Sequence, residues 1–277
     1  MTKIMKRSGG YLAGLFWAVL TIYPFFFTLM SSFKNNDEIF SSAAAPLQLP
    51  AQFRIENYVE ALVTGNMAQC LLNSLVLSAA STALVLLLAA MSAFVLARLP
   101  GKLNNTIYLY FTLGIMIPIH STLVPLTKIV NSLRGQNSYL MLMVIYAAFN
   151  LPLAVMIIAA NMRGISKSMD ESALLDGCSA LRLFSSIILP LSLPGLSTVG
   201  IITFLYIYND LLFGVLFLSN RDLYTISLGM QTFVGSKVTT YGPIFASIII
   251  AVIPMIIVYL LFQSKVEAGL TAGAVKE

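Results

Sequence analysis

The residues best suited to binding another molecule lie in one stretch, MDESALLDGCSALRLFSSIILPLSLP, which begins at Met169 and ends at Pro194. It places charged groups and a glycine between two long apolar segments. Ser168 and Glu171 have the spacing of a capping box, which predicts a short helix from about Met169. The last turn of this helix is expected to end at Asp176, with Gly177 as the stop.

A second short helix is predicted from about Ser179 to Pro190. On the first helix, Ala173, Leu174 and Cys178 offer small or apolar surface beside acidic side chains. An apolar edge with a charged rim is typical of a surface that docks into a groove of another protein. The alternative is a helix that lies on lipid headgroups. The whole inner connection over 163–194 carries three acids and three bases, so it lacks the basic face that such a helix usually presents to anionic lipid.

Enzyme chemistry is largely excluded by what the chain lacks. Its single histidine, His120, rules out an HExxH zinc site and any site that needs two imidazoles. Gly101-Lys102 is followed by leucine, so it does not form a phosphate-binding GxxxxGK[ST] loop. No GxSxG elbow and no cluster of acids that would hold magnesium is present. The chain is therefore expected to need no cofactor, and if ATP is used, another chain binds it.

Four polar residues in apolar segments are candidates for lining a solute pathway, because polar groups in hydrocarbon normally face the interior of a helix bundle. Asp210, next to Asn209, is interpreted either as a pathway residue or as a packing or interfacial residue, with equal weight. His120 follows Pro118, and carbonyl groups freed by proline favour an internal partner for it. Asn150 lies beside Pro152, where backbone groups also need partners.

Composition identifies the bilayer as the solvent of this chain. It is 58% hydrophobic and 10% charged, whereas a soluble domain has roughly 25% charged residues. Several apolar runs reach the ~20 residues that a helix needs to cross a membrane. The chain is therefore predicted to be an all-α integral membrane protein of one domain over residues 1–277. Six transmembrane helices are expected at about 11–31, 71–97, 105–127, 138–162, 197–219 and 241–263, the third being interrupted by His120 and two prolines.

The distribution of Lys and Arg predicts that both termini are cytoplasmic. Ten of the 16 basic residues would lie on the inner side and six on the outer side. The net charge of +5 is mostly this bias, so no nucleic-acid partner is implied. The first apolar run is too long for a signal peptide core and is expected to stay as an anchor. Cys70 and Cys178 would lie near opposite faces and so could not pair.

Two connections are interpreted as external, about 32–70 and 220–240. The first carries four acids and several prolines. These connections either meet an extracellular partner or only cover helix ends. Residues 163–194 form the inner connection that contains the two short helices.

These residues carry a family resemblance. Glu171-Ser-Ala173, Asp176-Gly177 and Ile187 with Leu189-Pro190 resemble the EAA loop of permease subunits in binding-protein-dependent ABC importers. Ser172 departs from the usual alanine. Further similarity lies in SFKNNDEIF, ENYVEAL, LLNSLVLS, Asn209-Asp210 and the C-terminal GLTAGAVK, the last of which is similar to the MalG-like carbohydrate branch.

The resemblance implies a type I importer permease fold with a MetI-like core in the bacterial inner membrane. It implies a sugar importer, formed with a second, different permease subunit, two cytoplasmic ATPases that bind ATP and Mg, and an external solute-binding protein. The residues expected to couple to the ATPase are Glu171, Ser172, Ala173, Asp176, Gly177, Leu189 and Pro190. Glu171 would pair with a basic residue of the ATPase or serve its own capping box, and both hold if one carboxylate oxygen serves each.

Other readings are less well supported. A stand-alone secondary transporter should show repeated halves and ion ligands in mid-membrane, and neither is seen. A membrane enzyme lacks its catalytic cluster. Within the importer family, the nearest alternative is a permease for glycerol phosphate or a polyamine.

Overall fold

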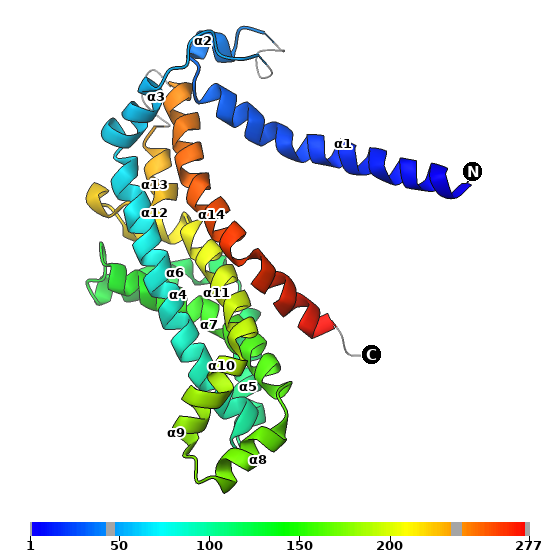
Figure 1. Cartoon of the computed structure of the whole chain (residues 1–277). Helices are drawn as coiled ribbons and strands as arrows, with labels where there is room; N and C mark the ends of the chain where they lie inside the picture. The colour runs from blue at the N-terminus through cyan, green and yellow to red at the C-terminus, as the bar shows by residue number, and fades with distance from the viewer. Residues whose placement is uncertain (1, 43–47, 234–239, 275–277) are drawn as a thin grey trace. The chain divides into compact units, whose positions relative to one another are not determined.

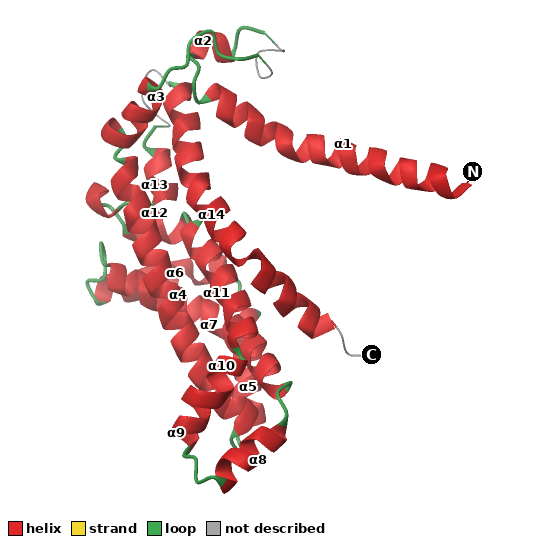
Figure 2. Ribbon diagram, viewed as in Figure 1, coloured by secondary structure: helices red, strands yellow, loops and turns green. Residues whose placement is uncertain are grey.

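Helices and the loops between them make up the part of the chain that can be described (Figure 2). The computed structural model describes residues 2–42, 48–233 and 240–274, and it describes the side chains of residues 10, 11, 13–42, 48–233 and 240–262. Within these ranges no strand is present, which confirms the predicted all-α class. The final residues of the C-terminal GLTAGAVK and parts of both predicted external connections lie outside the described residues.

The helices follow one another along the chain with short connections. The α-helices are α1 (Thr2–Ser31), α2 (Asn36–Ile39), α3 (Glu56–Val59), α4 (Met67–Arg98), α5 (Asn104–Ile115), α6 (Ile119–Ser132), α7 (Tyr139–Arg163), α8 (Lys167–Leu175), α9 (Ala180–Leu183), α10 (Leu189–Leu191), α11 (Leu193–Tyr208), α12 (Leu212–Phe217), α13 (Ile226–Gln231) and α14 (Tyr241–Ala274). Two π-helical segments, Glu60–Thr64 and Phe184–Ile188, and a 3-10 turn, Arg221–Leu223, complete the described elements.

Four helices are long and apolar enough to cross a membrane. They are α1, α4, α7 and α14, and they coincide with four of the predicted spans. Two bent helix pairs raise the number to six if each pair is counted as one span. The described chain is therefore a multi-pass membrane protein, as its composition predicts.

The predicted third span over 105–127, which His120 and two prolines interrupt, is bent, because the chain breaks there into α5 and α6. The two helices meet at an angle of 98°. Pro118 is the N-cap of α6 in an extended conformation, with ψ of 124°. A proline disfavours helical geometry in the residue before it, which explains why α5 does not continue. Pro125, in contrast, lies inside α6.

The predicted span over 197–219 is also broken. Helix α11 begins earlier, at Leu193, and ends at Tyr208, and α12 starts only at Leu212. The segment Ala180–Leu191 directly precedes α11, and the two form a helix pair that is bent by 73°. The predicted second short helix from Ser179 is confirmed, since Ser179 is its N-cap and the helical path runs through Phe184–Ile188 to Leu191.

The described chain divides into two compact units. The first comprises Met1–Leu71 and Leu228–Pro254, and the second comprises Leu72–Ser227 and Met255–Glu277. In the first unit, part of the predicted external connection 32–70 is ordered around Lys34, which is 2% exposed and whose Nζ donates to Gln48 O. Asn57 Nδ2 donates to the carbonyl oxygens of Ser32 and Lys34. Burial lowers the pKa of Lys34, and the Glu38 carboxylate raises it in part.

The core of the second unit lies where α4, α7 and α11 pack together. Its fully buried members include Val85 and Ala93 from α4, Ile158 and Met162 from α7, and Val199 from α11. Small residues on α4 allow the helices to approach closely. Helices α8 and α9 lie together at one end of this unit (Figure 1). Both contribute a buried residue to the same core, so they are packed against the bundle.

Candidate functional site

Helix α8 begins two residues earlier than the capping box predicts. Its N-cap is Ser166, whose hydroxyl oxygen accepts from the backbone N–H of Ser168 at 3.3 Å. The Ser168 hydroxyl lies 2.7 Å from that of Ser166 and does not cap the helix. The predicted capping box of Ser168 and Glu171 is therefore wrong. As a result, the Glu171 carboxylate does not serve as a capping group at the N-terminus of α8.

The end of α8 is as predicted. Gly177 has φ of +76°, which is the left-handed conformation that glycine adopts at little cost. Its N–H donates to Leu174 O at 3.0 Å, and the N–H of Cys178 donates to Ala173 O at 2.9 Å. This pair of bonds is the Schellman arrangement that closes a helix. No heavy atom outside its neighbours lies within 4 Å of the position where a Cβ would be, so the requirement for glycine here comes from the backbone conformation.

Helix α8 has an inner and an outer face. Asp170 and Ala173, three residues apart, turn toward the protein, and Ala173 is only 6% exposed. Glu171, Leu174 and Leu175 share the opposite face, because residues three and four apart lie side by side on a helix. Leu174 is 61% and Leu175 89% exposed, which leaves a large apolar surface beside a free carboxylate. Leu175 was not among the residues predicted to couple, although its spacing from Glu171 could have indicated it.

A small groove lies on another side of α8, and Glu171, Leu174 and Leu175 do not line it. It has a volume of about 320 Å³. Its lining residues come mainly from α8, and they are Ser168, Met169, Ser172, Ala173, Asp176 and Ile187. Ser172, Ala173 and Asp176 thus lie together at the groove. Of the predicted coupling residues, the structure brings these three and the exposed Glu171 and Gly177 onto one projection.

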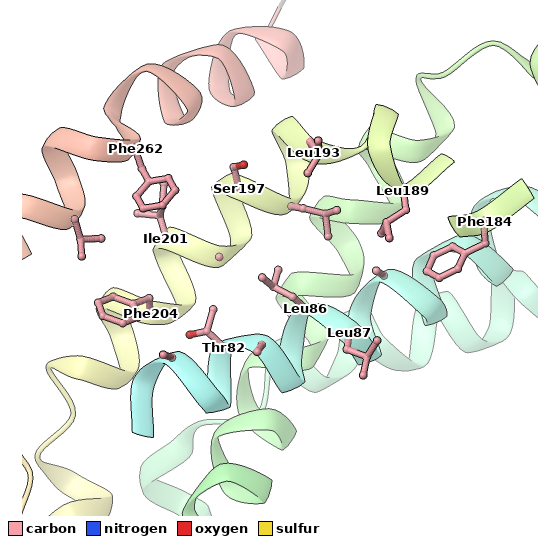
Figure 3. Close-up of a pocket in the computed structure, with 16 residues that line it drawn as sticks. Thr82, Leu86, Leu87, Phe184, Leu189, Leu193, Ser197, Ile201, Phe204 and Phe262 are labelled. Carbon is pink, nitrogen blue, oxygen red and sulfur yellow. The ribbon is translucent and has the colours of Figure 1, made fainter. Parts of the chain in front are cut away.

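Leu189 and Pro190 lie apart from that projection. Pro190 is exposed, whereas Leu189 lines a different pocket of about 640 Å³ formed by α4, α10, α11 and α14. Figure 3 shows Leu189 and Leu193 on one side of this pocket and Leu86 of α4 on the other. Its lining is almost entirely hydrocarbon, so it offers few groups to a polar solute.

An ion pair that the sequence did not suggest joins α8 to the bundle. Arg98 Nη1 donates to Asp170 Oδ2 at 3.0 Å, and the two side chains are 1% and 14% exposed. Arg98 Nη2 donates to the carbonyl oxygens of Met162 and Ile165 at 2.6 and 2.8 Å. Because Asp170 is paired with Arg98 and largely buried, it adds little to the surface charge of α8. Among the acids of this helix and its C-cap, Glu171 and Asp176 remain exposed.

Three of the four predicted pathway residues meet at one pocket. His120, Asn209 and Asp210 line a space of about 560 Å³. The other lining residues are Ile119, Leu205, Tyr206, Leu211 and Leu212. The pocket lies at the breaks between α5 and α6 and between α11 and α12. Asn150 does not belong to it, and its Nδ2 donates to Tyr146 O at 2.8 Å within α7.

Asp210 has a structural role that sets its orientation. Its Oδ2 accepts from the hydroxyl of Tyr146 at 2.9 Å and from the N–H groups of Phe213 and Gly214 at 3.1 and 3.4 Å. Tyr146 is fully buried. The carboxylate therefore fastens the start of α12 to α7, which agrees with the packing interpretation. Asp210 also lines the pocket, and its pathway role stays a prediction.

His120 and Asn209 are exposed at the pocket. Asn209 Nδ2 donates to Leu205 O at 2.8 Å. Within the described residues no hydrogen bond to the His120 side chain is found, so the expected internal partner for this imidazole is not observed.

Comparison with known proteins gives consistent matches. The family model described as "Binding-protein-dependent transport system inner membrane component" matches residues 85–271. The diacetylchitobiose uptake system permease protein NgcG of Streptomyces coelicolor is 33% identical over 261 residues, covering 94% of this chain and 85% of that protein. The trehalose/maltose transport system permease protein MalG of Thermococcus litoralis is 30% identical, covering 99% and 98%.

A solved structure shares the fold. It is a chain of a bacterial ABC transporter involved in the import of the acidic polysaccharide alginate. The TM-score is 0.83 at 17% sequence identity, with 95% of this chain and 96% of that chain covered. The fold predicted from the resemblance, that of an importer permease, is thereby confirmed.

Proposed function

Because the chain belongs to the family of inner-membrane components of binding-protein-dependent transport systems, we propose that it is a permease subunit of an ATP-driven importer of sugars. It forms half of the translocation pathway, and a second permease chain forms the other half. An external binding protein delivers the solute, and two ATPase subunits on the cytoplasmic side supply the energy.

The observation that carries this proposal is the outer face of α8. Leu174 and Leu175 expose apolar surface at the end of a membrane protein's helical bundle, and Glu171 lies beside them without an internal partner among the described residues. Burying one such leucine in an interface stabilises it by roughly 1.5–3 kcal/mol. With Glu171 and Asp176 both exposed, the face matches an apolar groove with a basic rim. That is the chemistry proposed for the ATPase surface.

Nucleotide chemistry is assigned to the partner. The described residues contain no group of three or more His, Cys, Asp or Glu side chains placed to hold a metal ion, and the sequence contains no phosphate-binding loop. ATP and Mg²⁺ would therefore be bound by the ATPase subunits. Conformational change in those subunits would reach this chain through α8.

The orientation that fits this arrangement places α8 and both termini in the cytoplasm. The greater number of Lys and Arg residues on that side supports it. The connection 32–70 then lies outside, where a binding protein would dock.

A neutral solute suits the pocket around Asp210. The pocket offers a carboxylate, an amide, an imidazole and the Tyr206 ring, and its eight lining residues include no Lys or Arg. An anionic solute such as glycerol phosphate lacks a positive partner there, and a polyamine would meet one carboxylate whose Oδ2 already accepts three hydrogen bonds. The names of the relatives, which refer to diacetylchitobiose and to trehalose and maltose, support a sugar.

The proposed mechanism is alternating access. ATP-driven closure of the ATPases moves α8, and the broken helices move with it so that the pathway opens to one side and then to the other. The breaks at α5–α6 and α11–α12 lie at the Asp210 pocket, where a small rotation would change the access of solute.

Affinity purification from detergent tests the proposal. The tagged chain is expected to retain a second permease and an ATPase. Leu175→Asp is expected to lose the ATPase and keep the second permease, because a charge replaces the exposed apolar contact. Leu133→Asp is the matched control, since Leu133 is 63% exposed in the connection after α6. A wild-type chain that purifies alone, or a Leu175→Asp variant that keeps the ATPase at wild-type affinity, would contradict the proposal.

A further inference from the structure

We propose that Arg98 is a positioning residue that clamps α8 to the ends of α4 and α7, so that these three elements move as one body when α8 is displaced. The inference rests on the proposed function, because it concerns how movement of α8 reaches the helices of the pathway. All of its groups belong to the second unit.

The geometry places Arg98 at a junction of three elements. Arg98 is the last residue of α4. One terminal nitrogen, Nη1, donates to Asp170 Oδ2 on α8, and the other, Nη2, donates to the carbonyl oxygens of Met162 and Ile165 at and just beyond the end of α7. The guanidinium is almost completely buried. The Arg98 side chain therefore connects the ends of the two long helices, α4 and α7, to the short helix α8.

The chemistry requires an arginine. The last carbonyl groups of a helix have no partner within the helix, and they carry the negative end of its dipole. Arg98 places a cation at this end of α7, where Met162 O also accepts from the backbone N–H of Ile165, and it neutralises the Asp170 carboxylate at the same time. The planar guanidinium presents its donors in a fixed fork, whereas a lysine ammonium is a flexible point charge. Lysine would keep the charge but would not hold the three acceptors in one fixed arrangement.

Adjacent acids on α8 consequently have different roles. Asp170 faces inward to Arg98, and Glu171 faces outward beside the exposed leucines. Ala173 on the inner face is packed into the same core as α4 and α7. A force applied to the outer face is thus resisted by a buried ion pair and by packing on the inner face. Without the ion pair, α8 could tilt on its packing contact while α4 and α7 stayed in place.

Distance measurement between two spin labels tests the clamp directly. The labels are placed at Lys167→Cys on α8 and Val95→Cys on α4, both exposed, after Cys70→Ser and Cys178→Ser remove the two native thiols. The sample is the whole detergent-purified complex with its ATPase, measured without nucleotide and with MgATP and vanadate. In the otherwise unchanged complex, we expect one narrow distance distribution that is the same in both conditions.

Asp170→Asn and Arg98→Lys are expected to change that result. In both variants, a second or broadened distance population should appear when MgATP and vanadate are added, with Arg98→Lys the milder of the two. The equilibrium ratio of the original to the new α8–α4 distance should fall by a factor within the roughly 5- to 150-fold range of allosteric coupling. Lys102→Ala, which removes an exposed positive charge four residues after Arg98, is the matched control and should keep the single distribution.

The double variant Arg98→Met with Asp170→Leu separates the clamp from a folding defect. It removes both buried charges, and a buried pair replaced by apolar residues is often well tolerated. We expect it to purify with the ATPase in greater yield than the single variants, yet to show the second distance population. A single unchanged distribution in Asp170→Asn and in the double variant would overturn the inference. A wild-type chain that binds no ATPase would instead contradict the proposed function, so the two failures can be told apart.

Discussion

Substitution of Gly177 gives the sharpest prediction about the end of α8. This residue has φ of +76°, and a Cβ at this position would meet nothing within 4 Å. The cost of a side chain is therefore set by the backbone conformation. An L-residue in the left-handed region costs about 1–2 kcal/mol, which corresponds to a factor of roughly 5–30 in the population of the native turn.

A graded series isolates this effect. Asn adopts the left-handed conformation more readily than other residues with a side chain, so Gly177→Asn should behave almost as wild type. Gly177→Ala should be weaker, and Gly177→Val should be weakest because valine is β-branched. We expect each variant to insert into the membrane, since the turn lies outside the long apolar helices.

The assay is the affinity of the purified ATPase for the permease in nanodiscs, together with solute uptake by cells that express the variant. The expected loss of affinity for Gly177→Ala is about 5–30-fold, by the conversion above, with a parallel loss of uptake. Wild-type affinity and uptake for Gly177→Val would refute the reasoning. Equal losses for Asn and Val would show that the partner excludes any side chain at this position, which is a different cause.

The remaining predictions concern stability and contact. Asp210→Ala should lower the free energy of unfolding in detergent by about 1–3 kcal/mol, because the buried Tyr146 hydroxyl loses its acceptor. A lowering below about 0.5 kcal/mol on the same scale would contradict the structural role of Asp210. Gly195→Ala should cost about 1–3 kcal/mol by overpacking, since its Cβ would lie 2.8 Å from the Cβ of Asn161; unchanged thermal unfolding would show that α7 and α11 are less closely packed. Leu175→Asp should leave thermal unfolding unchanged, because Leu175 is 89% exposed, and a marked loss of stability would place this leucine in the core.

Much of the fold could be predicted because a long run of apolar residues is enough to identify a membrane-spanning helix. The four unbroken spans appear as long apolar runs that require no knowledge of neighbours. The two broken spans could not be delimited in the same way. Around Pro118 and Asn209 the breaks are marked only by proline, by His120 and by the pair Asn209-Asp210. Proline and single polar residues also occur inside membrane helices, so these residues do not fix where a helix ends.

Features of the candidate site that depend on neighbouring residues in the sequence could be predicted. Features that depend on contacts between distant residues were missed. Gly177 was found because a left-handed helix end favours glycine. The N-cap was misplaced because Ser166 and Ser168 are both suitable residues, and only the fold selects between them. Arg98 was not singled out from the sequence, because a sequence does not show that its partner, Asp170, lies 72 residues away.

The most direct test of the central claim, that the outer face of α8 docks on an ATPase, is cross-linking from a single cysteine. Leu175→Cys is introduced into a chain in which Cys70 and Cys178 are replaced by serine, and membranes that contain the whole complex are treated with a short bifunctional maleimide. The account predicts a covalent adduct with the ATPase and no reaction with a membrane-impermeant maleimide added outside intact cells. Labelling from outside the cell without an adduct would contradict it.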